Sequence, residues 1–182
     1  AAAGYDQKIS VILDTIDIVP DCKDERGRTP LSVAAAQGHS AAVRLLLSRD
    51  TRGMNSVDNL NRTPLFYAAQ RGEKKIVLIL LNQSQVSADI ADSNHHSPLS
   101  VAVQEGHEDI VRLLLLRNDV KVNSKDKYGR TSLSFAAEGG NMSMVKILLD
   151  HGCDINIADR NGYSPLWYGL EKKHEVVVKF LL

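Results

Sequence analysis

Aromatic residues are scarce in this chain of 182 residues: they make up only 5% of it, whereas hydrophobic residues as a whole make up 43%. Leu, Val, Ile and Ala therefore supply the apolar surface, which indicates thin layers packed on small and branched side chains rather than one thick core. Two cysteines, Cys22 and Cys153, are too few for a disulfide framework or a cysteine metal cluster. The longest apolar runs, at 76–81 and 113–116, are too short to span a membrane.

An excess of charge of either sign is also absent, because 22 Lys and Arg residues balance 22 Asp and Glu residues. Proteins that bind nucleic acids or anionic membranes usually carry a basic excess, so both classes are disfavoured. The first residues, Ala-Ala-Ala-Gly, lack the basic flank and the apolar core of a signal peptide. We therefore expect a cytoplasmic or nuclear protein.

One short pattern, a Thr or Ser followed by Pro and Leu, recurs along the chain, with Ser132 in place of Pro in one copy. An Asp stands five residues before each Thr or Ser, a Gly stands nine residues after the first four, and a Val stands fourteen residues after each. A fixed period of this kind is the signature of a repeat architecture. The central residues, called anchors below, are 34, 34, 34 and 33 residues apart: Thr29, Thr63, Ser97, Thr131 and Ser164.

Each period predicts two helices. A Thr or Ser hydroxyl caps free backbone N–H groups, and Pro is tolerated at the first helical position, so the first helix begins after the anchor. The Gly ends that helix in the left-handed conformation. The second helix then carries Val and a Leu-Leu pair as one apolar stripe, and about ten polar residues lead to the next anchor.

These features resemble the ankyrin repeat: the Asp-x-x-Gly-x-Thr-Pro-Leu opening, the Ala-Ala pair, the Gly helix stop, Val-x-x-Leu-Leu, and Gly152-Cys153-Asp154-Ile155-Asn156 at a loop position. The resemblance implies an all-α solenoid of stacked helix–turn–helix units with projecting β-turn loops. It places one ankyrin-repeat domain over 1–182, with a partial repeat at 1–23, full repeats at 24–57, 58–91, 92–125 and 126–158, and a truncated repeat at 159–182.

Some positions depart from the family pattern. The His that follows Thr-Pro-Leu in the family is replaced in every repeat, so its cross-repeat hydrogen bonding is not expected. The first three junctions between repeats lack a loop Gly, and irregular hairpins are expected there. The chain begins and ends inside a repeat, which indicates a piece of a longer protein, with a monomer expected for this piece. The replaced family His positions are Ser32, Phe66, Ser100, Ser134 and Trp167.

No spacing in the sequence indicates catalysis or metal binding. The pairs His95-His96 and His174-Glu175 lack the further ligands of a zinc motif, and no nucleophile motif is present. Histidines after the helix-stop Gly are expected to pack in turns, and Cys153 is expected to be a buried thiol. We expect no catalytic residue, no cofactor and no metal, and therefore no enzyme activity.

A repeat array binds its partners through exposed positions that are not needed for stacking. By resemblance, these are the turn tips and the exposed face of the first helix on the concave side. The residue before each anchor is Arg28, Arg62, His96, Arg130 or Tyr163, and two interpretations of this row stay open. The row is a cationic groove for an acidic or phosphorylated segment, or its Arg residues are filler paired with nearby Asp. The candidate partner-binding residues are Arg26, Arg28, Leu60, Arg62, Arg71, His96, Tyr128, Arg130, Arg160 and Tyr163.

The last repeat gathers aromatic residues, which allow either a methyl-lysine cage or plain packing at the end of the array: Tyr163, Trp167, Tyr168 and Phe180. The favoured function is a non-catalytic module that binds a protein or peptide on its concave face and turn tips. The alternative is a regulatory, substrate-docking or ligand-sensing appendage of a multidomain enzyme or NTPase receptor. Short segments such as Arg-Thr-Pro-Leu-Ser at 28–32 and Val-Asn-Ser-Lys-Asp at 122–126 are similar to those in the repeat arrays of fungal NACHT-type receptors. Direct nucleic-acid binding is a third, disfavoured hypothesis.

Overall fold

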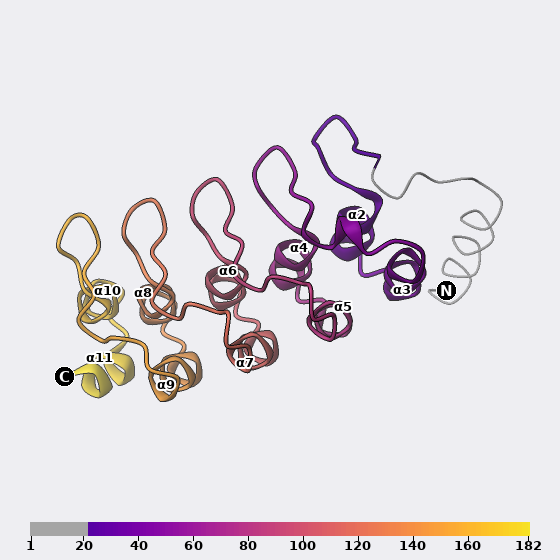
Figure 1. Cartoon of the computed structure of the whole chain (residues 1–182). Coiled ribbons are helices and arrows are strands. Elements are labelled where there is room, and N and C mark those ends of the chain that lie inside the picture. The colour runs from indigo at the N-terminus through magenta and orange to yellow at the C-terminus, as the bar shows by residue number, and fades with distance from the viewer. Residues whose placement is uncertain (1–21) are drawn as a thin grey trace.

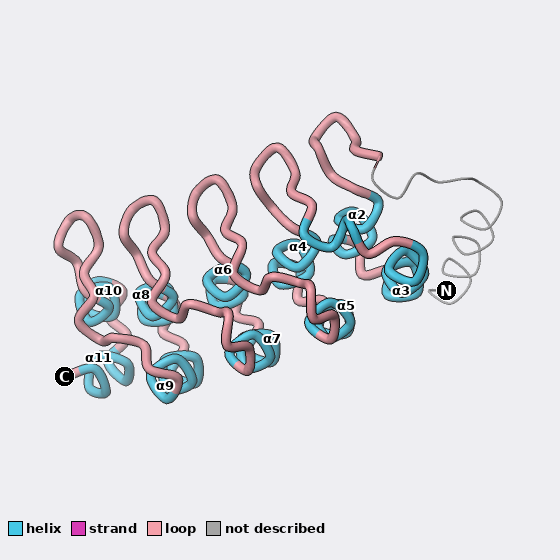
Figure 2. The backbone as a smooth tube through the Cα atoms, in the orientation of Figure 1, coloured by secondary structure: helices cyan, strands magenta, loops and turns pink. Residues whose placement is uncertain are grey.

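A computed structural model describes residues 22–182 of the chain. Five pairs of short helices follow one another and stack into an elongated array (Figures 1 and 2). Within the described residues no strand is present, so the predicted all-α solenoid is confirmed. The predicted partial repeat at 1–23 lies almost wholly outside the described residues. The pairs are α2 (Pro30–Ala36) with α3 (Ser40–Arg49), α4 (Pro64–Arg71) with α5 (Lys74–Leu81), α6 (Pro98–Gln104) with α7 (Glu108–Leu115), α8 (Ser132–Glu138) with α9 (Met142–Asp150), and α10 (Pro165–Glu171) with α11 (Glu175–Leu181).

Every first helix begins at its anchor, as predicted. In each pair the anchor has an extended backbone, and its side-chain oxygen accepts a hydrogen bond from the backbone N–H three residues later. In three repeats, the Ser that replaces the family His takes part in this cap. Ser32 and Ser134 face the hydroxyl of their own anchors at 3.1 and 3.2 Å, and Ser100 Oγ donates to the carbonyl of Ser97. These serines therefore serve their own helix.

The two helices of a pair are joined by a tight turn in which one residue is left-handed. Gly38, Gly72, Gly106 and Gly140 have φ between 67° and 77°, as predicted. In the last pair Lys173 adopts the same conformation with φ of 59°, so the turn survives the loss of its Gly. A side chain with a Cβ pays a small strain energy there.

The core is a continuous apolar strip between the two rows of helices. Successive first helices pack against one another, successive second helices do the same, and each first helix packs on its own second helix. The Val of each Leu-Leu helix is fully buried in the middle of the array, at Val77, Val111 and Val145. Small residues at the first helices, such as Ala35, Ala68 and Ala102, are also 0% exposed, which allows the close approach of neighbouring helices.

The junctions between pairs are irregular, as the missing loop Gly predicts. After α3 the chain runs into a short 3-10 helix, η1 (Arg52–Asn55), which packs on α4 and buries Met54. Asp50 is extended there, with φ of −150°. Among the described residues, the left-handed residues other than Gly are Asn61, His95 and Lys173, so no residue just after α3, α5 or α7 takes the conformation of the missing loop Gly.

Candidate functional site

Five loops project beside the first helices (Figure 1). Each loop contains the recurring Asp. In each loop one carboxylate oxygen accepts hydrogen bonds from the backbone N–H groups two and four residues later. For Asp126 the donors are Tyr128 and Arg130, both at 2.8 Å. The residue before the last of these donors is left-handed in every loop, whether it is Gly, Asn61 or His95. The turn is therefore fixed by one carboxylate.

Neighbouring loops are joined to one another by backbone hydrogen bonds of 2.9–3.0 Å. The N–H groups of Asn59, Ser93, Lys127 and Arg160 donate to the carbonyls of Arg26, Leu60, Asn94 and Tyr128, respectively. These four hydrogen bonds connect the five tips in a row. The tip side chains stand on a connected backbone, so a partner that binds them orders little of the chain on binding.

The row of residues before the anchors is largely paired with the recurring Asp. Arg28, Arg62 and Arg130 each donate from Nε to the second carboxylate oxygen of Asp24, Asp58 and Asp126, at 2.8, 3.0 and 3.0 Å. The side chains of Asp58 and Asp126 are only 1% exposed, whereas those of Arg62 and Arg130 are 23% and 22% exposed. The pairing favours the second interpretation of the row, in which the arginines are bound to nearby Asp.

Aromatic rings pack against the arginines of the same row. The Arg62 guanidinium carbon lies 4.8 Å from the Tyr67 ring centroid, and that of Arg130 lies 4.4 Å from the Phe135 ring centroid. Tyr67 also donates its hydroxyl to Asp58 at 2.6 Å. Burial alone would raise the pKa of Asp58, but the hydrogen bonds from Tyr67 and Arg62 outweigh it and hold that pKa below its usual value. Burial and the Asp58 carboxylate raise the pKa of Tyr67 to about 12.

His96 occupies the middle of the row and lies between two carboxylates. Its Nδ1 is 3.6 Å from Asp92, and its Nε2 is 3.7 Å from Asp126, both beyond hydrogen-bond distance. Nε2 is buried and has no hydrogen-bond partner among the described residues. The imidazole edge also faces Phe135, at 6.0 Å between centroids. His96 therefore does not reproduce the Arg–Asp link of its neighbours.

The predicted tip residues are the exposed part of this surface. Leu60 is 51% exposed and Tyr128 is 52% exposed, and they occupy the same position in loops two repeats apart. Lys127 Nζ lies 5.0 Å and the Arg130 guanidinium 5.5 Å from the Tyr128 ring centroid. Arg26 and Arg160 are exposed at their tips, and Arg71 is exposed at the end of α4. The candidate residues Arg26, Leu60, Tyr128 and Arg160 thus lie at the tips, beside the row that contains the paired arginines, while Arg71 lies apart on α4.

The aromatic residues of the last pair do not form a cage. Tyr163 and Trp167 stack face to face, with ring centroids 3.7 Å apart and planes 12° apart, which leaves no room for a methylammonium group between them. Tyr168 packs edge-on against both and donates its hydroxyl to Asp159 at 2.8 Å. Phe180 lies elsewhere, on α11, near Lys146. This geometry corresponds to the plain packing alternative.

A family model described as ankyrin repeats in three copies matches the chain over residues 1–93, 52–126 and 99–182. The matches together cover the whole sequence. The chain belongs to the ankyrin-repeat family. No curated protein is significantly similar to it in sequence. Ankyrin repeats are generally protein–protein interaction modules, and domains built from them are typically non-catalytic.

Histidines that follow the helix-stop Gly join successive ankyrin repeats. The Nε2 atoms of His107 and His174 lie 3.2 and 3.0 Å from the carbonyl oxygens of Gln70 and Glu138, at the ends of the preceding first helices. The imidazoles pack so closely beneath Gly72 and Gly140 that an added Cβ would come within 2.7 and 2.5 Å of them. The turn packing predicted for these histidines is confirmed, and it acts between repeats.

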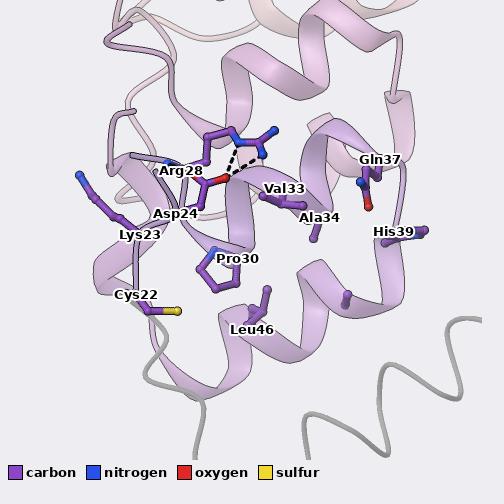
Figure 3. Close-up of a pocket in the computed structure, with 11 residues that line it drawn as sticks. Cys22, Lys23, Asp24, Arg28, Pro30, Val33, Ala34, Gln37, His39 and Leu46 are labelled. Carbon is purple, nitrogen blue, oxygen red and sulfur yellow. Dashed lines mark hydrogen bonds and ion pairs between the residues drawn. The ribbon is translucent and has the colours of Figure 1, made fainter. Parts of the chain in front are cut away.

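An apolar hollow of about 520 Å³ opens at the first described repeat of the ankyrin array (Figure 3). Its lining includes Pro30, Val33 and Leu46, with Arg28 and Asp24 paired at its rim. The equivalent of Leu46 in the next repeat, Leu80, is 0% exposed because the preceding repeat covers it. The hollow therefore lies on the stacking face of a repeat, and its lining is mainly apolar but also includes Lys23, Gln37 and His39.

The described part of the ankyrin array offers little for metal binding, membrane insertion or thiol chemistry. Between residues 22 and 182 no group of three His, Cys, Asp or Glu residues is arranged to hold a metal ion. No helix described there is long and apolar enough to cross a membrane. Cys153 is buried, as predicted, and burial raises the pKa of its thiol to about 12.

Sequence reasoning left the pairing of the recurring Asp with the Arg four residues later as one of two alternatives. It missed a set of polar links between the junctions, made by Asn55, Arg117 and Asn123. A signal for the last set was present, because Asn or Asp recurs eight residues before the second to fifth anchors, at Asn55, Asp89, Asn123 and Asn156.

Proposed function

We propose that the chain is a non-catalytic recognition module that binds a partner protein or peptide along its loop tips and the adjoining concave face of its first helices. The observation that carries this proposal is that the loops combine a connected backbone with exposed side chains. The backbone is joined from tip to tip, while Leu60 and Tyr128 are half exposed at equivalent positions. Exposed aromatic and apolar side chains on a preorganised backbone are typical of binding hot spots.

An acidic or phosphorylated group is the partner chemistry that suits the exposed arginines. Arg26 and Arg160 are exposed tip residues at the two ends of the line. Arg62 and Arg130 are held on one side by Asp58 and Asp126, and Arg130 Nη1 also lies 3.7 Å from Glu138, so they offer only part of their N–H groups. Because these carboxylates offset the charge of the row, we expect single carboxylate or phosphate groups in the partner rather than a polyanionic stretch.

The test removes tip side chains that the fold does not need. Affinity capture from the source cell compares the wild-type chain with the double variant Leu60→Ala/Tyr128→Ala and with Leu116→Ala. Leu116 is 76% exposed at the end of α7, away from the loops, and serves as the matched control. We expect all three to melt at the same temperature, and the captured partner to be lost only from the double variant. Equal capture by all three would contradict the proposal.

The acidic character of the partner is tested separately by Arg26→Glu/Arg160→Glu, which reverses two exposed charges. Weaker capture supports an acidic partner, and unchanged capture excludes one at these tips. Charge reversal of Arg62 or Arg130 is a poor test, because it would place a Glu beside a buried Asp carboxylate and lower the stability of the fold.

We also propose that the chain is intracellular and has no catalytic role. Ankyrin repeats are commonly intracellular. Both cysteines are free thiols. The recurring carboxylates, which are the most regular chemical feature of the sequence, already accept hydrogen bonds within their own loops.

A further inference from the structure

A polar side chain recurs in the junctions between helix pairs, eight residues before the anchors. Asn55 shows what this position does. Its Nδ2 donates to the carbonyl of Gln85, 30 residues later, at 2.7 Å, and its Oδ1 accepts from the backbone N–H of Ser87, 32 residues later, at 3.0 Å. One amide thus links two junctions through both of its ends.

Asn123 makes the same two-sided link further along the array. Its Nδ2 donates to the carbonyl of Gly152 at 3.3 Å, and its Oδ1 accepts from the backbone N–H of Asp154 at 2.9 Å. The spacings are one residue shorter, as expected from the shorter last period of the repeat. The link requires a side chain that is donor and acceptor at once, which an amide provides.

Asp89 holds the same position between these two, at the centre of the array. The backbone N–H of Lys121, 32 residues later, favours its ionised carboxylate, which corresponds to the acceptor half of the link. Its Oδ1 is buried and has no hydrogen-bond partner among the described residues. By the spacing of Asn55, the carbonyl that an amide would bind belongs to Asp119. An ionised carboxylate cannot donate to it.

The charged groups around Asp89 come from the following junction. Burial raises the pKa of Asp89, the backbone N–H and the charge of Lys121 lower it, and the Asp119 carboxylate raises it, with a net increase. Asp119 is itself held by Arg117 Nε at 2.9 Å and by the backbone N–H of Ala88 at 2.9 Å. Arg117 also donates to the carbonyl of Val86 at 2.9 Å. These contacts join the two junctions next to Asp89, but none of them supplies a hydrogen-bond donor to its Oδ1.

We propose that Asp89 is a proton-sensitive joint at the centre of the array. When ionised, it makes half of the link between the junctions and leaves a buried oxygen without a donor. When it takes a proton from solvent, its O–H donates to the Asp119 carbonyl and completes the link that Asn55 and Asn123 make permanently. Mild acid therefore tightens the contact between the two junctions that contain Asp89 and Asp119, and the tips at Leu60 and Tyr128 lie on opposite sides of this joint.

The experiment compares the wild-type chain with Asp89→Asn, Asn55→Asp and Asp150→Asn. Urea unfolding is followed by circular dichroism between pH 7.5 and 4. At pH 7 we expect Asp89→Asn to raise the folding equilibrium constant by about tenfold, because it supplies the missing donor. The gain shrinks as the pH falls towards the ordinary aspartate value of 3.8, since protonated Asp89 then makes the same bond. Asn55→Asp is expected to show the converse, a loss at pH 7 that recovers in acid.

Asp150→Asn removes an exposed carboxylate and controls for the general effect of charge; we expect no pH-dependent difference from it. Amide hydrogen exchange gives a local readout: exchange at Lys121 should slow in Asp89→Asn relative to the wild type at pH 7. A gain from Asp89→Asn that is the same at every pH, or no gain at all, would overturn the proposal. The result is independent of partner binding, so it distinguishes this joint from the recognition function.

Discussion

At the scale of single residues, the loops depend on a recurring carboxylate that binds both the backbone of its turn and neighbouring side chains. One oxygen of Asp58 accepts from the backbone of its turn, and the other accepts from Tyr67 and Arg62. A buried carboxylate is stable only when donors replace the water that it loses. The arginines before the anchors are therefore first of all structural partners of the Asp, and only part of their N–H groups is available to another molecule.

Removing one donor from such a carboxylate should lower stability in a pH-dependent way. For Tyr67→Phe we expect a loss of about 1–3 kcal/mol at pH 7, the cost of an unsatisfied buried group. The pKa of Asp58 is lowered in the folded state, so its contribution to stability is present above the unfolded pKa and is lost as the pH falls. The deficit of Tyr67→Phe should therefore shrink in acid.

Urea unfolding between pH 7 and pH 3 measures this effect. Tyr128→Phe is the control, because Tyr128 is 52% exposed at a tip and its loss of a hydroxyl leaves no buried group unpaired. A deficit that is constant with pH would show that Tyr67 acts through packing alone.

At the scale of helices and turns, the sequence predicted what local chemistry decides. The hydroxyl at each anchor and the Gly nine residues later act within a few residues, so their positions mark helix ends directly. The irregular junctions were predicted only as irregular, because η1 depends on the burial of Met54 against α4, which is a tertiary contact. The pairing of Arg62 with Asp58 was one of two open alternatives, since a spacing of four residues does not show which way a loop side chain turns.

The turns between paired helices lead to a prediction about the histidines that cross to the preceding repeat. His107→Ala removes the contact with the Gln70 carbonyl and leaves space beneath Gly72. We expect a loss of about 1–3 kcal/mol in unfolding free energy, from one hydrogen bond and the packing of the ring. His39→Ala is the matched control, because His39 occupies the same position in the first described repeat and makes no such bond within residues 22–182. Equal losses from both variants would show that the contact between repeats contributes nothing.

At the scale of the whole molecule, the array between residues 22 and 182 is held together mainly by contacts between neighbouring pairs. Helices pack within their pair and on the adjacent pairs, and the polar links of the loops and junctions also join adjacent repeats. Such an architecture approaches a one-dimensional chain of units, in which stability is the sum of unit and interface terms. The scarcity of aromatic residues agrees with this architecture, because each thin layer encloses few large rings, such as that of Phe66.

The position of a core side chain along the array should therefore decide how its loss is felt. Leu114, 0% exposed on α7, lies in the central pair, while Val177, 1% exposed on α11, lies in the last pair. For Leu114→Ala we expect a loss of about 2–5 kcal/mol and a lower midpoint for most of the array, because two interfaces share the cavity. Val177→Ala should instead increase hydrogen exchange in α10 and α11 and leave exchange in α4 to α7 unchanged, since the pair α8 and α9 separates them from the change. Exchange that rises uniformly over all helices in Val177→Ala would show that the five pairs unfold as one unit, and the tips at Leu60 and Tyr128 would then be coupled to both ends of the array.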